Sequence, residues 1–112
     1  MNKKILIFKN DRGGDLLNSI KCISTLLKKN NLVTIYLSQF NYSFSFLFKN
    51  AIIKKINYDL NIINKIQIFF HLFKNKYDEV YILTPKIYYY FLAIFFRKVK
   101  FYAITVNGTK RN

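Results

Sequence analysis

The sequence is poor in the residues that staple small folds together. It has one cysteine, one proline, three glycines and no tryptophan among 112 residues. Because Cys22 stands alone, neither an intramolecular disulfide nor a cysteine-based zinc site can form, which favours a reducing compartment and a core position for Cys22. A hydrophobic core must hold the chain, and a chain of this length fits one domain that buries about two-thirds of its unfolded surface.

Long apolar runs are also missing. The longest, Ile87 to Phe96, lies between Lys86 and Arg97 and is about half of the ~20 residues that a membrane-spanning helix needs. The apolar run from Ile5 to Phe8 is too short for a secretory signal, since a polar loop follows it at once. We therefore expect a cytoplasmic protein, and peripheral contact with the inner face of the cytoplasmic membrane stays open.

Acidic residues are scarce: five stand against 19 lysines and arginines, which gives a net charge of +14 and a pI near 10.0. Such a balance favours an anionic partner, for example a glycan, a membrane surface or nucleic acid. Drift in an AT-rich genome is the alternative explanation, because lysine, asparagine, isoleucine, phenylalanine and tyrosine all have AT-rich codons. The lysines occur in ones and twos along the chain, so a dedicated nucleic-acid arm is not expected.

Short apolar runs bounded by polar breaks predict five buried strands. We expect them at Ile5 to Phe8, Leu32 to Leu37, Ile52 to Tyr58, Glu79 to Leu83 and Lys100 to Ile104. Helical spacing of apolar residues predicts connecting helices from about Asp15 to Lys29, around Asn41 to Lys49, from Leu60 to Lys74 and over Ile87 to Phe96.

Two of these helices also carry predictions about individual side chains. In the third, Leu60, Ile63, Ile66, Phe70 and Phe73 form the expected core-facing stripe, with Asn61, Asn64, Lys65 and Lys74 outward. The fourth is apolar all round and is expected to be buried, with Tyr88, Tyr89 and Tyr90 packing in the core. His71 has no histidine or carboxylate partner three or four positions later, so a structural role is expected.

Alternation of strands and helices predicts an α/β fold with a mostly parallel, Rossmann-like sheet covered on both faces. Residues 1–112 are expected to form one such domain. Ligand sites in these folds lie at the carboxyl ends of the strands. The segment Asn10-Asp11-Arg12-Gly13-Gly14-Asp15 follows the first predicted strand, so it is placed where a site should be.

This loop is neither of the common phosphate cradles, since GxxxxGK[ST] is absent and Gly13-Gly14 lacks the spacing of GxGxxG. The paired glycines permit a tight turn or a close approach to a ligand. Asp15 could cap the helix that follows, because a carboxylate there accepts backbone N–H bonds. A receiver-type domain is disfavoured, since the acidic pair and the later aspartate of such domains are missing.

The segment from Lys4 to Leu17 resembles the amino terminus of glycosyltransferase family 9, the ADP-heptose:lipopolysaccharide heptosyltransferase family. Lys76-Tyr77-Asp78-Glu79-Val80-Tyr81-Ile82-Leu83 is similar to a later strand of that family with its preceding aromatic-aspartate pair, and residues 99–111 are similar to its next strand and basic turn. The resemblance implies half of a GT-B architecture, namely the acceptor-side domain without the carboxy-terminal donor domain.

By this resemblance, Asp15 would be the catalytic base of an inverting glycosyltransferase that uses a nucleotide-sugar donor such as ADP-heptose, with no cofactor and no metal. The acceptor would be a lipopolysaccharide or another anionic, lipid-linked glycan of the cell envelope. The substrate-binding residues expected with it are Asn10, Asp11, Arg12, Gly13, Gly14, Thr84, Lys86 and Lys110. Lys9 is a further basic residue near the same crevice.

Alone, such a half-domain should transfer little or no sugar. It would be a fragment, a remnant, or a split subunit completed by a separate donor-binding domain. The other function that stays open is a noncatalytic basic α/β module that binds an anionic glycan, a membrane surface or nucleic acid. Strong salt dependence without dependence on Asp15 would indicate that module.

Overall fold

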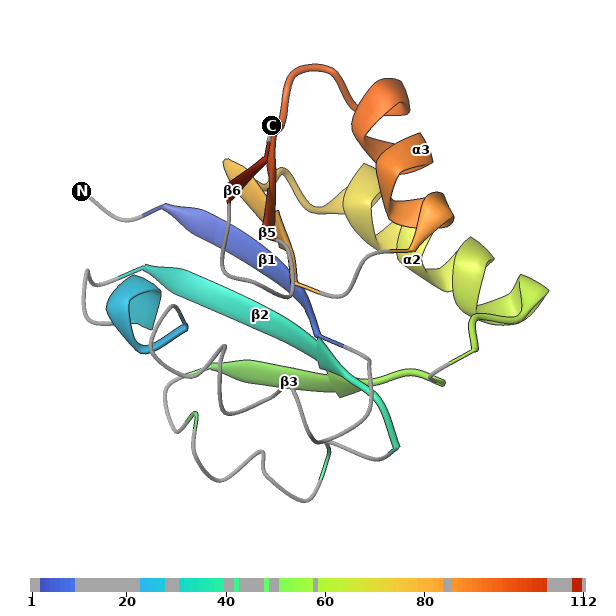
Figure 1. The fold of residues 1–112 in the computed structure, drawn as a ribbon, viewed down its shortest axis with the longest axis horizontal. Helices are drawn as coiled ribbons and strands as arrows, with labels where there is room; N and C mark the ends of the chain where they lie inside the picture. Colours follow the sequence, from blue (N-terminus) through green and yellow to red (C-terminus); the bar gives the residue numbers. More distant parts are fainter. Residues whose placement is uncertain are drawn as a thin grey trace.

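The computed structural model describes residues 3–9, 23–27, 31–39, 42, 48, 51–57, 59–83, 86–104 and 110–111. Its centre is a six-stranded sheet in the order β3-β2-β1-β4-β5-β6, visible in Figure 1. The strands are β1 (Lys4–Lys9), β2 (Leu32–Leu37), β3 (Ile52–Lys55), β4 (Glu79–Ile82), β5 (Lys100–Ile104) and β6 (Lys110–Arg111). The first five pair in parallel, whereas β6 pairs antiparallel with β5, so the predicted mostly parallel α/β sheet is confirmed.

The central strand β1 is buried on both faces, as its continuous apolar run predicts. Successive side chains point to opposite faces of a strand. Leu6 and Phe8 therefore enter one hydrophobic core, and Ile5 and Ile7 enter the other. Two cores separated by one sheet define a three-layer arrangement.

Helices cover both faces of the sheet. Residues 23–27 are helical, and Ile23 and Leu26 pack in the core that contains Ile5 and Ile7. Helices α2 (Ile62–Lys74) and α3 (Ile87–Phe95) lie on the other face, next to each other in Figure 1. Asn61 begins α2 as its N-cap, because its side-chain oxygen accepts the backbone N–H of Asn64 at 2.8 Å.

Predictions about the third strand, α2 and α3 need correction. The third strand ends at Lys55 instead of Tyr58, because Lys55 is the register partner of Leu37, the last residue of β2. In α2 the predicted core stripe is solvent-facing: Ile63, Phe70 and Phe73 are exposed, along with Ile66. The buried residues of α2 are Ile68 and Leu72, on the opposite side of the helix.

Asn64, expected outward, is half-buried. The second helix with an unexpected orientation is α3, which is buried along only one side, through Tyr89 and Leu92. Its neighbour Tyr88 is half-buried and Tyr90 is exposed. The physical reason is the same in both helices: each is apolar around more of its circumference than the sheet can cover.

Polar contacts tie the amino ends of β1 and β4 together. Lys3 Nζ lies 3.0 Å from Glu79 Oε2, and the Tyr81 hydroxyl donates to the other Glu79 oxygen at 3.1 Å. The backbone N–H of Lys4 donates to Asp78 Oδ2 at 2.8 Å. A hydrogen bond to Glu79 raises the pKa of Lys3. These contacts give Asp78 and Glu79 a structural role at the edge opposite the predicted site.

Candidate functional site at the carboxyl ends of β1 and β4

The strand order creates one topological switch point, between β1 and β4. From β1 the chain runs outward through β2 to β3, then returns to the other side of β1 as β4. Phe8 and Ile82 are register partners, and the backbone N–H of Leu83 donates to the Phe8 carbonyl at 3.0 Å. The two strands thus end at the same level. Ligands of open α/β sheets bind outside the carboxyl ends of strands at such a point.

Most of the predicted site residues lie outside the described residues: Asn10, Asp11, Arg12, Gly13, Gly14, Asp15 and Thr84. Their position is constrained at one end, since Asn10 directly follows the last residue of β1 and Thr84 follows Leu83. Both segments therefore leave the sheet at the switch point. The roles predicted for these residues stay predictions.

The structure does place Lys86 and Lys110. Lys86 is the N-cap residue of α3, has an extended backbone and is half-buried. Lys110 belongs to β6 and pairs with Ile104, the last residue of β5. Its backbone is therefore at the carboxyl edge of the sheet, but β4 and β5 separate it from β1. Lys86 is the nearer of the two to the switch point along the chain, because it follows β4.

Two polar residues at this edge are buried: Lys9, which the sequence places among the basic residues that could bind phosphates or carboxylates of an acceptor, and Ser38, for which it predicts no role. Lys9, the last residue of β1, is only 2% exposed, and Ser38, immediately after β2, is fully buried. A buried ammonium group is stable only when oxygen atoms or a negative charge surround it. The signal available in the sequence was a lysine at the end of an otherwise apolar strand. The strand order that encloses this lysine could not be predicted from that signal.

Aromatic rings pack together below this edge, on the face of the sheet that α2 and α3 cover. Phe8 stacks on Tyr89 with ring centroids 4.0 Å apart and on Tyr36 at 5.5 Å. Burial raises the pKa of the Tyr36 hydroxyl, so that group stays protonated at neutral pH and cannot serve as a base. These stacked rings form an apolar layer below the carboxyl edge.

The first turn of α3 adds a favourable environment for an anion. No side chain caps this helix start through a hydrogen bond, and its first turn has no acidic residue. The first N–H groups of a helix carry partial positive charge. Together with the half-buried Lys86, they place positive potential beside the end of β4.

His71 belongs to α2 and lies between Tyr36 and Tyr77. Its ring meets Tyr36 edge-on at 5.8 Å, and its Nε2 is hydrogen-bonded to the Tyr77 hydroxyl. Burial, assisted by the charges of Lys54 and Lys4, lowers the pKa of His71. These contacts give His71 a structural role in the packing of α2. Within the described ranges, no three histidine, cysteine or acidic side chains are grouped so that they could hold a metal ion.

Comparison of the chain with protein-family models, with curated proteins and with solved structures finds no match. The candidate site therefore rests on strand order, burial and charge. In the part of the chain that the structure describes, no helix is long and apolar enough to cross a membrane.

Proposed function

We propose that the chain is the acceptor-side half-domain of a GT-B glycosyltransferase similar to family 9, which transfers a sugar from a nucleotide-sugar donor such as ADP-heptose to a cell-envelope glycan. The observation that carries the proposal is the position of β1. It lies at the topological switch point, and the Asn10–Asp15 loop begins where β1 ends. A loop at that point is where open α/β sheets bind their ligands.

In the proposed reaction, the Asp15 carboxylate takes the proton from an acceptor hydroxyl. The hydroxyl oxygen forms a bond to the anomeric carbon of the donor sugar, and the nucleoside diphosphate leaves from the opposite side with the electron pair of the broken bond. Inversion at the anomeric carbon follows from this geometry. Positioned bases of this kind contribute about 10²–10⁴-fold to rate.

Basic groups at the carboxyl edge supply the charge needed for an anionic acceptor. Lys86 and the uncapped start of α3 are near the end of β4, and Lys110 extends the edge toward β6. Arg12 belongs to the loop itself. Charge-assisted hydrogen bonds from lysine and arginine to phosphate or carboxylate are about twice as strong as neutral ones.

A fusion of this chain to the donor domain of a heptosyltransferase tests the proposal. We expect the fusion to transfer heptose from ADP-heptose to a truncated lipopolysaccharide acceptor, and Asp15→Asn to lower the rate by about 10²–10⁴-fold. Asp59→Asn is the matched control and should leave the rate unchanged. Circular dichroism checks that both variants fold. A fusion in which Asp15→Asn retains full turnover would remove the base assignment.

The surplus of 14 positive charges favours the noncatalytic binding module as the second candidate. In that case the isolated chain binds an anionic glycan with an affinity that falls steeply with salt. Asp15→Asn would leave that affinity unchanged or increase it, and the fusion would show no transfer. Assays of the chain, its fusion and their Asp15→Asn variants therefore distinguish the two candidate functions.

A further inference from the structure

Helix α2 has two apolar sides, and only one of them meets the sheet. Ile68 and Leu72 are buried, whereas a second stripe is largely exposed. That stripe consists of Ile62, Ile63, Ile66, Phe70 and Phe73, whose exposed fractions run from 49% to 74%. Exposed apolar side chains scattered singly are ordinary on protein surfaces, but a continuous stripe along a helix indicates something that covers it.

Helix α3 repeats the pattern beside it. Tyr89 and Leu92 are buried, and the remaining side of the helix exposes a second set of large apolar residues: Ile87, Tyr90, Phe91, Ile94 and Phe95. Aromatic contacts join the two helices, since the ring of Phe69 lies 5.0 Å from that of Phe95 and 5.4 Å from that of Phe96. We call the exposed residues of both sets the outer helix face.

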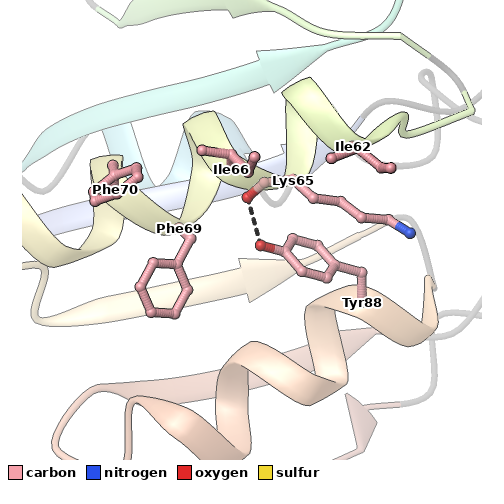
Figure 2. Close-up of a pocket in the computed structure, with 6 residues that line it drawn as sticks. All are labelled: Ile62, Lys65, Ile66, Phe69, Phe70 and Tyr88. Atoms are coloured by element: carbon pink, nitrogen blue, oxygen red, sulfur yellow. Dashed lines mark hydrogen bonds between the residues drawn. The ribbon is translucent and has the colours of Figure 1, made fainter.

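A pocket opens between the two helices on this face (Figure 2). Its volume is about 220 Å³, and its lining residues are Ile62, Lys65, Ile66, Phe69, Phe70 and Tyr88. The Tyr88 hydroxyl donates to the Lys65 carbonyl at 2.5 Å and so fixes one wall. Pockets for drug-sized ligands are about 300–1,000 Å³. This one suits a slender apolar group, such as part of one lipid tail.

Positive charges predominate around the outer helix face. No aspartate or glutamate occurs in residues 60–77 or 80–112. Lysines and arginines do occur beside both helices, and five of them are Lys65, Lys74, Lys86, Arg97 and Lys98. Lys65 Nζ lies 5.8 Å above the ring of Tyr88, at the rim of the pocket. The face is therefore apolar at its centre, and basic residues outnumber acidic ones along its border. The acidic residue nearest to it along the chain is Asp59, two positions before the N-cap of α2.

We propose that the outer helix face docks on an anionic lipid surface, with isoleucine and phenylalanine side chains among the acyl chains and the bordering lysines and arginines at lipid phosphates. Amphipathic helices with an apolar side and basic flanks bind membranes in this way, and basic residues near an anionic leaflet strengthen the attraction. Docking is independent of the proposed glycosyl transfer, because it uses neither Asp15 nor the loop that contains it.

Charge also decides against a second copy of the chain as the occupant. A two-fold symmetric contact would place the same basic border against itself, in a protein whose net charge is +14. Like charges brought together across an interface weaken association. An anionic bilayer neutralises the same border, so it fits the face better.

Docking would also bring lipid headgroups near the candidate site. Helix α2 follows β3, and α3 follows β4, so both helices begin at the carboxyl edge of the sheet. Ile62 and Ile87, the first residues of the two helices, are 74% and 89% exposed. The outer helix face therefore extends to the edge where the Asn10–Asp15 loop begins, which is the geometry that a lipid-linked substrate requires.

Vesicle co-sedimentation with the full chain tests the docking. We expect binding to mixed phosphatidylglycerol–phosphatidylcholine vesicles and little binding to phosphatidylcholine alone. The double variant Phe70→Ser and Phe91→Ser should bind the mixed vesicles roughly tenfold more weakly, because two partly exposed aromatic anchors are lost. Lys65→Gln with Lys98→Gln should weaken binding severalfold. All four side chains are exposed, so circular dichroism should be unchanged.

Matched controls distinguish the outer helix face from general attraction of a basic protein. Leu32→Ser removes an equally exposed apolar side chain on β2, and Lys55→Gln removes a charge on β3. Leu32→Ser should retain full binding, and Lys55→Gln should weaken it less than the loss of Lys65 and Lys98 does. If the Phe70 and Phe91 double variant binds like the unmodified chain, or if the unmodified chain ignores the mixed vesicles, the proposal is wrong. A lipid-free dimer that the same double variant dissociates would identify a second copy as the occupant and overturn it as well.

Discussion

His71 is the sole histidine of the chain, and it is held between an aromatic strand residue and an aromatic loop residue. The rings of Tyr36 and Tyr77 flank it, and Asn75 Nδ2 lies 3.3 Å from its Nδ1. Burial is the largest cause that lowers the pKa of His71 below the ordinary value of 6.5, followed by the charges of Lys54 and Lys4. The folded state therefore favours a neutral imidazole.

A dependence of stability on pH follows from that shift. Below pH 6.5 the unfolded chain binds a proton at His71 more readily than the folded chain does, so this residue makes the free energy of unfolding fall as the pH drops. We expect urea denaturation between pH 7 and pH 5 to show a smaller loss in His71→Gln than in the unmodified chain. The single histidine signal in a proton NMR titration should give a pKa below 6.5. A pKa at or above that value would contradict the described packing.

Buried positions of individual polar residues were harder to predict than those of apolar residues. Lys9 stands in the sequence as one of many lysines, and lysine is almost never fully buried. Its burial is decided by the place of β1 in the middle of the sheet, flanked by β2 and β4. That order depends on contacts between residues more than 70 positions apart, such as Leu6 with Val80. Local sequence patterns do not predict such contacts.

At the scale of elements, strands were predicted well because burial on both faces leaves a continuous apolar run. Leu32 to Leu37 and Lys100 to Ile104 begin and end as predicted. The strand at Ile52 was predicted too long: it ends at Lys55, the register partner of Leu37, where β2 also ends. Edge strands lack the pattern that makes central ones recognisable.

Helix α2 shows where periodicity stops being informative. An apolar stripe predicts that one side of a helix will be covered, but α2 carries two such stripes. The stripe of Ile63, Ile66, Phe70 and Phe73 has the stronger repeat, yet the sheet covers Ile68 and Leu72. Which stripe packs inward depends on the complementary shape of the sheet, and that shape is a tertiary property.

Two alanine substitutions within α2 test its rotation about its own axis. Ile68→Ala should lower the free energy of unfolding by about 2–5 kcal/mol, the usual cost of removing a large buried side chain. Phe73→Ala should change it by less than about 0.5 kcal/mol, since Phe73 is 69% exposed. Both substitutions place alanine in the same helix, so helix propensity largely cancels in the comparison. Chemical denaturation of the two variants gives the answer. The reverse order would mean that Phe73 faces the core, and it would also remove the outer helix face.

At the scale of the whole molecule, the candidate site follows from topology more than from its own residues. Parallel pairing of β1 with both β2 and β4 places the ends of these strands together, and the predicted alternation of strands and helices already implied that edge as the location of a site. The sequence could name Asp15 and its loop because glycine and aspartate cluster there. It could not show that Lys9 and Ser38 are buried at the same edge, because their burial depends on the neighbouring strands.

Net charge acts on the whole molecule as well. The net charge of +14 produces a repulsion that is stronger in the compact fold than in the extended chain, and salt screens that repulsion over a Debye length of about 10 Å at 0.1 M. We therefore expect the urea midpoint to rise when potassium chloride is increased from millimolar concentrations to about 0.5 M, because the Debye length shortens as salt is added. The Lys3–Glu79 pair works in the opposite direction, but it is a single, partly exposed ion pair, and such pairs contribute little to stability. A midpoint that falls with salt would show that attractive pairs dominate.

An anionic surface should stabilise the fold for the same reason that salt does, so mixed phosphatidylglycerol vesicles should raise the melting temperature at low salt and lose that effect at high salt.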